Sequence, residues 1–484
     1  MSVVSPRAAL DRYFRISERG STFGREVRGG VVTFFAMAYI VVLNPLIIGN
    51  APDVDGAFLG VGIGEEPNLA KIAAATALVA GVLTIAMGVV ANFPLAVAAG
   101  LGLNAFVAFG LATQMTWADA MGLVVIEGIL IVILVLTGFR QAVFNAVPRS
   151  LKTAISVGIG LFIALVGLVN AGFVTSTGVP SPPIGLGADG ALSTLPVAVF
   201  VVGLITLIVL YIRKVKGAIL WTIVGTAVLA VIVEQIADLG TTYDNPAGWN
   251  LNAPAVPDRV VDLPDLGLLG EFSLLGSWES VGVVSVLLFV FTLMLADFFD
   301  TMGTMVAVGS EGDLLDADGN PHNSREILLV DGIATVAGGT AAVSSNTSYI
   351  ESASGVGEGA RTGLASVITG LCFLLAMFFA PLVGMVPNEA AAPALVLVGF
   401  LMMTQVKNIP WDDLELAIPA FLTIALMPFT YSITTGIGAG FLGYVLVKLA
   451  RGKVRDVHPL LWVVAAFFLV YFAIHPIEML LGIS

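Results

Sequence analysis

The chain has 484 residues, of which 57% are hydrophobic and only 11% are charged, and its formal net charge is −13 at pH 7. Soluble domains carry about 25% charged residues, so the composition excludes a soluble globular protein and predicts an all-α polytopic membrane protein. The single cysteine, Cys372, excludes an internal disulfide and a cysteine-built metal site. We expect no metal, no cofactor and no nucleic-acid partner.

Fourteen apolar segments are expected to cross the bilayer, seven in each half of the chain. Each is close to the length that a membrane-spanning helix requires. They lie at 29–49, 71–91, 94–110, 117–138, 151–170, 196–212, 217–237, 279–309, 325–342, 345–359, 362–386, 391–406, 414–430 and 433–450. A further apolar run at 459–474 is short for a crossing, and its placement in the interface, as a re-entrant segment or as a fifteenth span stays open.

The distribution of basic residues orients the chain. The first thirty residues are polar and rich in arginine, so we expect them in the cytoplasm and expect no cleavable signal peptide. With this orientation, all basic residues except Lys71 and Arg259 fall into cytoplasmic segments. A shift by one span would reverse much of that pattern. The sequence therefore predicts a multi-pass protein of the plasma membrane with a cytoplasmic N-terminus.

The third span of each half is interrupted by glycine, proline or polar residues. The first reads FPLAVAAGLGLNAFVAFG and contains Asn104, and the second contains the run SSNTSYIE, which ends at Glu351. Irregular polar backbone at membrane depth is tolerated only inside protein or beside a watery cavity. Matching interrupted spans indicate a 7+7 inverted repeat with a site near the midplane. Two glycine-rich packing helices would explain the glycines, but not Asn104 or Glu351.

Several carboxylates lie inside the apolar spans, where an ionisable residue is a functional hypothesis by default. Asp297 and Asp300 lie three residues apart and therefore near one face of their helix. Such carboxyls can exchange a proton, as ion coupling requires. The alternative is a permanently protonated carboxyl, or one that bonds a backbone amide for packing. Asp331 is expected to support the interrupted second-half span from behind, and Glu351 to accept hydrogen bonds from a ligand.

Four stretches resemble the nucleobase:cation symporter family of the xanthine/uracil permease superfamily, most closely its AzgA-like adenine/guanine/hypoxanthine permease branch. They are TFFAMAYIVVLNP (33–45), MGVVANFPLAVAAGLGLNAF (87–106), DFFDTMGT (297–304) and NTSYIESASGVGEGARTG (346–363). The resemblance implies a homodimer whose subunits each have a core domain and a gate domain. It also implies a short strand in each broken span, the third and the tenth, near 101–104 and 346–349.

The resemblance also implies roles for individual residues. Asp300, in the pattern Asp-x-x-Gly, would contact the base and take part in coupling. Glu351 would bind the base, Asn104 would make a further polar contact, and Phe106 would stack on the purine. The expected substrate-binding residues are Asp300, Glu351, Asn104, Phe106 and Tyr349, and the expected proton-coupling residues are Asp300, Glu351, Asp297 and Asp331. Thr304 stands where uracil and xanthine permeases tend to carry His or Asp, which favours the purine branch.

The expected division of the chain follows from these spans. It begins with a cytoplasmic segment (1–28), followed by the first half of the core domain (29–138), the first half of the gate domain (139–237) and an acidic external loop (238–277). The second half of the core domain (278–388), the second half of the gate domain (389–450) and a C-terminal apolar extension (451–484) complete it. Glu358 and Arg361 are expected to form an ion pair near the cytoplasmic face.

The sequence thus predicts a secondary transporter and not an enzyme. It is expected to be a purine nucleobase:H⁺ symporter, with Na⁺ left open as the coupling ion. One alternative is a uracil or xanthine permease of the same family. A second is an anion transporter with the same fold, which would bind its substrate with a cation and helix N-termini. A channel would lack deep proton-binding carboxyls, and the spans offer no Ser/His pair or metal cluster for an intramembrane enzyme.

Overall fold

The computed structural model describes residues 6–138, 147–179, 181–187, 190–242, 245–250, 252–257, 259–316 and 320–481. The helices of the first half are α1 (Pro6–Phe14), α2 (Phe23–Met37), α3 (Ile40–Ile48), α4 (Leu69–Ala86), α5 (Leu101–Phe106), α6 (Trp117–Thr137), α8 (Arg149–Asn170), α9 (Leu195–Ile212) and α10 (Ala218–Ala237). Those of the second half are α11 (Gly276–Ser280), α12 (Gly282–Glu311), α13 (Ser324–Thr340), α14 (Ser352–Gly357), α15 (Gly363–Ala376), α16 (Asn388–Met403), α17 (Leu414–Phe429), α18 (Ile433–Ala450) and α19 (Pro459–Leu481).

The described strands are only three residues long and form two small sheets. They are β1 (Val97–Ala99), β2 (Val174–Ser176), β3 (Ile184–Leu186) and β4 (Asn346–Ser348). β2 pairs with β3 as a local hairpin, whereas β1 pairs antiparallel with β4 from the other half of the chain. The pair β1–β4 is fully buried. It therefore joins the two halves of the sequence in the interior.

Local signals fix the ends of the long helices. α6 begins after Thr116, whose side chain accepts a hydrogen bond from the amide of Asp119, and ends at Gly138, which has a φ of 72°. The threonine satisfies one of the free amides of the first turn, and glycine adopts the left-handed conformation at little cost. Between these signals the segment is almost wholly apolar, so the helix forms over the predicted span 117–138.

In the described residues, ten helices are long and apolar enough to cross a membrane. Four of the predicted spans take another form. The segment 94–110 contains β1 and α5, 345–359 contains β4 and α14, 325–342 is the 17-residue α13, and 414–430 is the 16-residue α17. The chain is thus a mostly helical membrane protein, and the count of fourteen spans stays a prediction.

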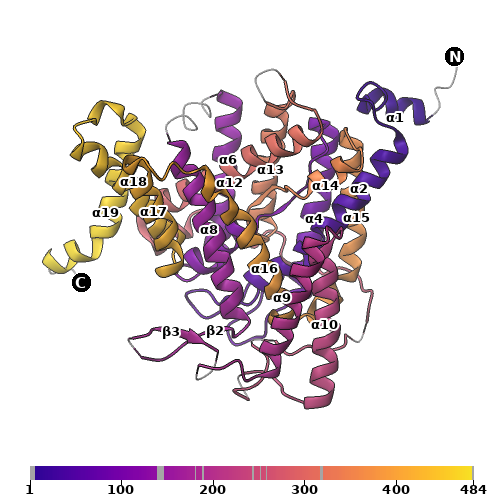
Figure 1. Ribbon diagram of the computed structural model, residues 1–484, viewed down its shortest axis with the longest axis horizontal. Helices are drawn as coiled ribbons and strands as arrows, with labels where there is room; N and C mark the ends of the chain where they lie inside the picture. Colours follow the sequence, from indigo (N-terminus) through magenta and orange to yellow (C-terminus); the bar gives the residue numbers. More distant parts are fainter. Residues whose placement is uncertain are drawn as a thin grey trace.

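The helices pack in two groups that mix both halves of the sequence. α2, α4 and α6 pack against α13 and α15, while α8 packs against α16 and α17. Figure 1 shows α8 and α16 near the centre of the molecule, with α2, α4 and α15 to one side. Close approach of α8 to α16 requires glycine, because a Cβ on Gly160 would lie 2.9 Å from the carbonyl oxygen of Gly399. The division into core and gate domains stays a prediction.

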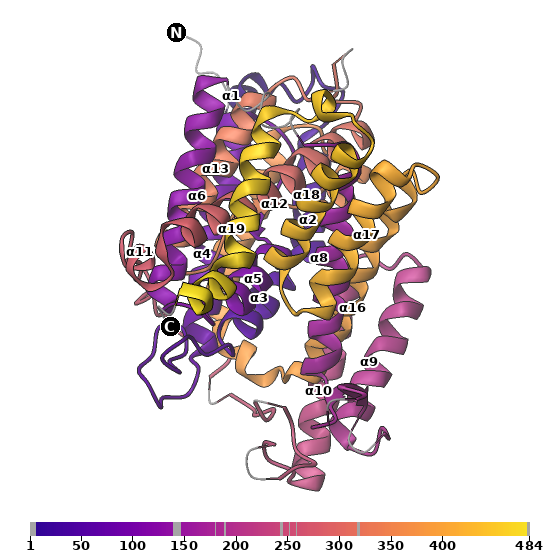
Figure 2. The same ribbon diagram turned by 90° about the vertical axis from the view of Figure 1, so that its left-hand side faces the viewer.

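The apolar run 459–474 lies within the 23-residue helix α19. α19 packs against α18 and α12, and Figure 2 shows it running beside them. Phe468 stacks on Phe441 of α18 with ring centroids 6.2 Å apart, and Tyr471 meets Phe289 of α12 edge-on at 6.2 Å. The C-terminal extension therefore contacts helices of both predicted domains.

The expected strand near 101–104 is wrong, because the strand in this region of the chain is β1 and residues 101–106 are helical. Ala98 lies opposite Thr347 in the β1–β4 register. The amide of Gly100 then donates to the carbonyl of Ser345 at 2.9 Å and ends the ladder. Pro94 cannot continue a helix from the preceding segment, so the chain stays extended until α5 begins at Leu101. The second expected strand, near 346–349, is present as β4.

Candidate functional site

Glu351 stands at the start of α14, directly beyond β4. It is the N-cap residue of that helix and is half-buried. Its Oε1 accepts a hydrogen bond from the hydroxyl of Tyr39, which lies between α2 and α3 and is 1% exposed. The carboxylate predicted as a ligand group therefore sits where a strand, a short helix and the α2–α3 junction meet.

Asp300 and Asp297 lie one turn apart on α12 but in different surroundings. Asp300 is exposed, and its helix packs against α14, whose N-cap is Glu351. Asp297 is fully buried, and its Oδ2 accepts a hydrogen bond from Thr335 of α13 at 3.1 Å. Of the two aspartates, Asp300 is thus the one that a ligand beside Glu351 would meet.

Asp331 of α13 supports β4 from behind, as expected. Its carboxylate accepts from Thr301 of α12 at 2.8 Å and from Ser348 of β4 at 2.9 Å. Thr301 also lies 2.8 Å from the hydroxyl of Thr347. All these groups are fully buried, so they form a dry network of hydroxyls around one carboxylate that ties α12, α13 and β4 together.

The other three predicted site residues are packed into protein. The Asn104 side chain is fully buried, and neither its nitrogen nor its oxygen has a partner in the described chain. The ring of Phe106 meets Phe289 edge-on at 6.3 Å. The hydroxyl of Tyr349 donates to the carbonyl of Ala99 in β1 at 2.5 Å. Asn104 is thus the one of the three that retains unused hydrogen-bonding capacity, which buried amides rarely do.

Two buried residues beside these groups were not predicted from the sequence. Glu127 of α6 is fully buried, with one oxygen 3.4 Å from Ser345 Oγ and the other without a partner in the described chain. The rule that flagged Asp297, an ionisable residue in mid-span, applies equally to Glu127. Tyr39 had no such signal, because its contact with Glu351 joins residues 312 positions apart.

The expected Glu358–Arg361 ion pair is wrong. Glu358 pairs instead with Arg28 of α2, at 2.9 Å, and with Lys216 of the α9–α10 connection. Gly359 has a φ of 95°, which turns the chain. Arg361 then donates to the carbonyl oxygens of Val356 and Ala360, each at 2.7 Å.

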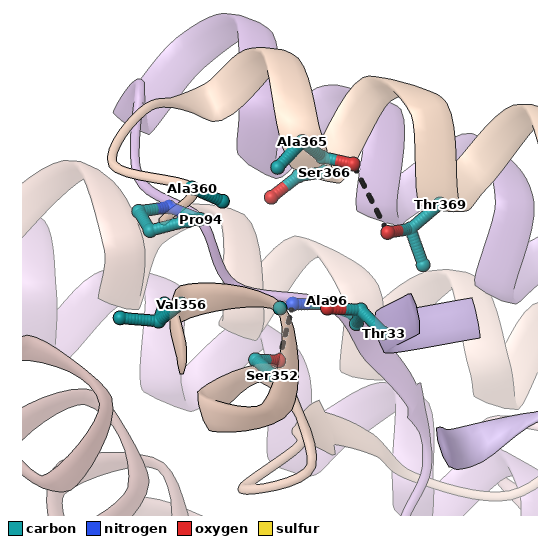
Figure 3. A pocket seen from close by; sticks show the side chains of 10 residues that line it. Thr33, Pro94, Ala96, Ser352, Val356, Ala360, Ala365, Ser366 and Thr369 are labelled. Atoms are coloured by element: carbon teal, nitrogen blue, oxygen red, sulfur yellow. Dashed lines mark hydrogen bonds between the residues drawn. The ribbon is translucent and has the colours of Figure 1, made fainter. Parts of the chain in front are cut away.

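Tight packing holds α14 in place. Figure 3 shows a crevice between α2, α14 and α15 that is lined by small residues such as Ala96, Ser352 and Ala365. Within it, the amide of Ala96 donates to Ser352 Oγ at 3.0 Å. The crevice has no room for a water-sized sphere. We therefore interpret it as a packing interface that fixes the helix carrying Glu351, and not as a ligand site.

None of the interior carboxylates has a cationic partner in the described residues. Every salt bridge found there involves Glu18, Glu358, Asp262, Glu415 or Asp456. Asp300 and Glu351 can therefore accept hydrogen bonds from a ligand, whereas the Asp331 carboxylate already accepts from the hydroxyls of Thr301 and Ser348.

The family model for xanthine/uracil permeases, described as a permease family, matches residues 24–439. The chain belongs to this permease family. It is 37% identical over 467 residues to the guanine/hypoxanthine permease PbuG of Bacillus subtilis, covering 96% of this chain and 99% of that protein. It is 36% identical over 471 residues to the adenine permease AdeQ of Escherichia coli, covering 96% of each.

Solved structures show the fold. The transmembrane domain of the cyanobacterial bicarbonate transporter BicA superposes with a TM-score of 0.58 at 14% identity, covering 86% of this chain and 97% of that domain. The murine anion transporter Slc26a9 superposes with a TM-score of 0.58 at 12% identity, covering 93% and 73%. The permease therefore shares a fold with these transporters, and its chemistry must be argued from its own side chains.

Proposed function

We propose that this permease transports purine nucleobases. The observation that carries the proposal is that α12, which carries Asp300, packs against α14, whose N-cap is Glu351. Neither carboxylate has a cationic partner in the described chain. An ionised carboxylate can accept hydrogen bonds but cannot donate them, and a purine offers ring N–H and amino donors. The similarity to guanine/hypoxanthine and adenine permeases over nearly the whole chain supports the same substrate class.

We further propose that Asn104 orients the base. Its buried amide can donate and accept at once, and both of its polar atoms are unused in the described chain. A bound base would satisfy them and remove the cost of leaving them unpaired. Phe106 and Tyr349 would then shape the walls of the site, with Tyr349 held by its bond to Ala99.

Coupling to protons is included in the proposal. Asp297 and Asp331 are buried without cationic partners in the described chain, and such carboxylates are costly when ionised, so binding a proton lowers their energy. Asp300 and Glu351 would exchange protons together with substrate, and Asp297 and Asp331 would hold protons behind β4. Fourteen spans of a 7+7 repeat, with the core domain (29–138 and 278–388) moving past the gate domain (139–237 and 389–450), would carry the base across.

The proposal includes the cellular setting predicted from the sequence. It places a homodimer in the plasma membrane with a cytoplasmic N-terminus. An anion carrier is the alternative suggested by the shared fold, but a bound anion would meet Asp300 and Glu351 without a compensating cation. A uracil or xanthine permease would differ from the proposed transporter only in the base that it transports. Competition between unlabelled bases therefore distinguishes the two.

The test is uptake of labelled hypoxanthine into proteoliposomes with and without an inward proton gradient. Wild type is compared with Asp300→Asn, Glu351→Gln and the matched control Asp412→Asn, an exposed aspartate outside the site. We expect saturable, gradient-driven uptake that is lost in both site variants, kept in the control, and inhibited by unlabelled guanine or adenine more than by uracil or bicarbonate. Gradient-independent uptake by both site variants would refute the proposal.

A further inference from the structure

The stretch 33–45 carries two buried polar side chains that face the second half of the chain. Tyr39 and Asn44 are 1% and 0% exposed. Asn44 Nδ2 donates to Thr76 of α4 at 2.8 Å and to the carbonyl of Val343 at 3.2 Å, just before β4. Tyr39 donates to Glu351, just after β4. The α2–α3 junction and α3 therefore hold β4 at both of its ends.

The bond from Tyr39 determines which oxygen of Glu351 remains available. A tyrosine hydroxyl has a single proton to donate, and it goes to Oε1. Among the described residues, no second side chain donates to this carboxylate, and the Glu351 side chain makes no capping bond to α14. One oxygen is thus held by Tyr39, and the residue's own amide also lies near the carboxylate. A carboxylate oxygen has two lone pairs, so the second oxygen can still accept from a donor on the ligand.

We propose that Tyr39 is the positioning residue for Glu351, and that it fixes the carboxylate so that a single oxygen is presented to an N–H group of the substrate. The inference rests on the proposed function, in which Glu351 binds the base. The terminal torsion of a glutamate is broad, so a free carboxylate would lose rotational freedom on binding. A carboxylate that is already held loses less, and its affinity is higher.

The support for Tyr39 is itself rigid. The side chain is enclosed at the α2–α3 junction, and Asn44 anchors α3 to α4 and to the segment before β4. On the other side, Gly355 of α14 packs directly against Thr33 of α2. Donor and acceptor therefore sit on elements that are packed against each other, which is what precise positioning of a binding group requires.

The test compares Tyr39→Phe with wild type in the uptake assay. The variant keeps the ring and removes only the hydroxyl. We expect the KM for hypoxanthine to rise by up to about tenfold, the cost of ordering one freed side chain on binding, with the maximal rate and the melting temperature close to wild type. Tyr13→Phe is the matched control, because it removes a hydroxyl bond to the carbonyl of Val89, at 3.0 Å, away from the site.

A double-mutant cycle shows whether Tyr39 acts through Glu351. The dissociation constant of labelled hypoxanthine is measured for Tyr39→Phe, Glu351→Gln and the double variant. If Tyr39 acts by positioning Glu351, removing the hydroxyl has little further effect once the carboxylate is gone. Additive effects would overturn the inference, and so would an unchanged KM in Tyr39→Phe, whether or not its stability falls. Wild-type protein that takes up no purine would instead refute the proposed function.

Discussion

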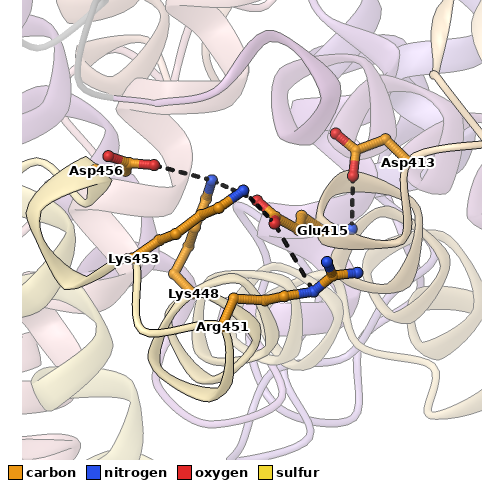
Figure 4. Close-up of polar contacts among 6 residues, drawn as sticks. All are labelled: Asp413, Glu415, Lys448, Arg451, Lys453 and Asp456. Carbon is orange, nitrogen blue, oxygen red and sulfur yellow. Dashed lines mark hydrogen bonds and ion pairs between the residues drawn. The ribbon is translucent and has the colours of Figure 1, made fainter.

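Two groups of carboxylates in this molecule are held in opposite ways. At the ends of α17 and α18, Glu415 accepts hydrogen bonds from Lys448 at 2.8 Å and from Lys453 at 2.6 Å, and Arg451 lies 3.8 Å away (Figure 4). Asp456 adds a second carboxylate 3.7 Å from Lys448. Every charge in this cluster, which we call the Glu415 cluster, has a partner of opposite sign.

The interior group contains only acids and hydroxyls. Asp331 is bonded by Thr301 and Ser348, Asp297 by Thr335, and Glu127 only weakly by Ser345. No lysine, arginine or histidine pairs with any of these three carboxylates in the described chain.

The difference separates a structural role from a functional one. A carboxylate surrounded by cations keeps a fixed charge and ties helix ends together. A carboxylate surrounded by hydroxyls has no fixed counter-charge, so it is free to take up a proton or to respond to a ligand. Substitutions in the two groups should therefore affect different measurements.

Among substitutions in these two groups, the largest effect is expected for Asp331→Asn. The amide keeps the size of the side chain but replaces one acceptor oxygen with a donor, so one of the hydroxyls of Thr301 and Ser348 loses its acceptor. We expect hypoxanthine uptake to fall about 100-fold, the equivalent of one or two charged hydrogen bonds. Asp412→Asn, an exposed substitution of the same kind, is the control. The amount of folded protein is measured by size-exclusion chromatography. Uptake within about twofold of wild type would contradict a functional role for the interior carboxylates.

Lys448→Met should affect stability and leave transport unchanged. Glu415 keeps Lys453 and Arg451, but it loses its most buried partner. The methionine keeps most of the apolar stem. We expect the melting temperature to fall and the KM for hypoxanthine to stay within about twofold of wild type. A normal melting temperature with impaired uptake would place this cluster with the functional group.

Thr335→Val tests a single hydroxyl of the interior group. Thr335 donates to Asp297 and also lies 3.1 Å from the carbonyl of Asn346. Valine fills the same space without the donor, so Asp297 loses its bond while the packing stays. We expect uptake to fall about fivefold, which corresponds to one neutral hydrogen bond of about 1 kcal/mol. Thr340→Val, in the last turn of the same helix, is the control, and equal effects of both variants would contradict a specific role.

The carboxylates within the spans could be predicted from the sequence. An ionised side chain in hydrocarbon is energetically unfavourable, so each such residue stands out without knowledge of its neighbours. Asp300, Asp331 and Glu351 were found in this way, and Asp331 does contact β4. Glu127 stands out in the same way but was passed over. The strand at β4 was expected from the family resemblance, whereas the polar run itself indicates only that this segment is not a lipid-facing helix.

Partners and boundaries were less predictable, because they depend on packing between distant segments. Pairing with β4 places the first strand at Val97–Ala99, four residues before the expected position. The partners of Glu358 come from α2 and from the α9–α10 connection, and a local spacing rule pointed to Arg361 instead. The bond of Tyr39 to Glu351 likewise joins two elements that only the fold brings together.

Lys216→Met should have the smallest effect, because the carboxylate that it pairs with has a second cationic partner. Lys216 is exposed, and Glu358 keeps Arg28 as a partner when the lysine is removed. The lysine end of the pair is 60% exposed, and ion pairs at the surface contribute at most about 1 kcal/mol. We therefore expect a nearly unchanged melting temperature and uptake within about twofold of wild type. Arg213→Met, an exposed basic residue of the same connection without an ion pair in the described chain, is the control.

The pair between Lys216 and Glu358 nevertheless joins a loop of the predicted gate domain to the end of α14 in the predicted core domain. A large loss of uptake in Lys216→Met alone, at unchanged stability, would therefore mean that a paired charge also serves transport, and pairing would no longer separate structural from functional carboxylates.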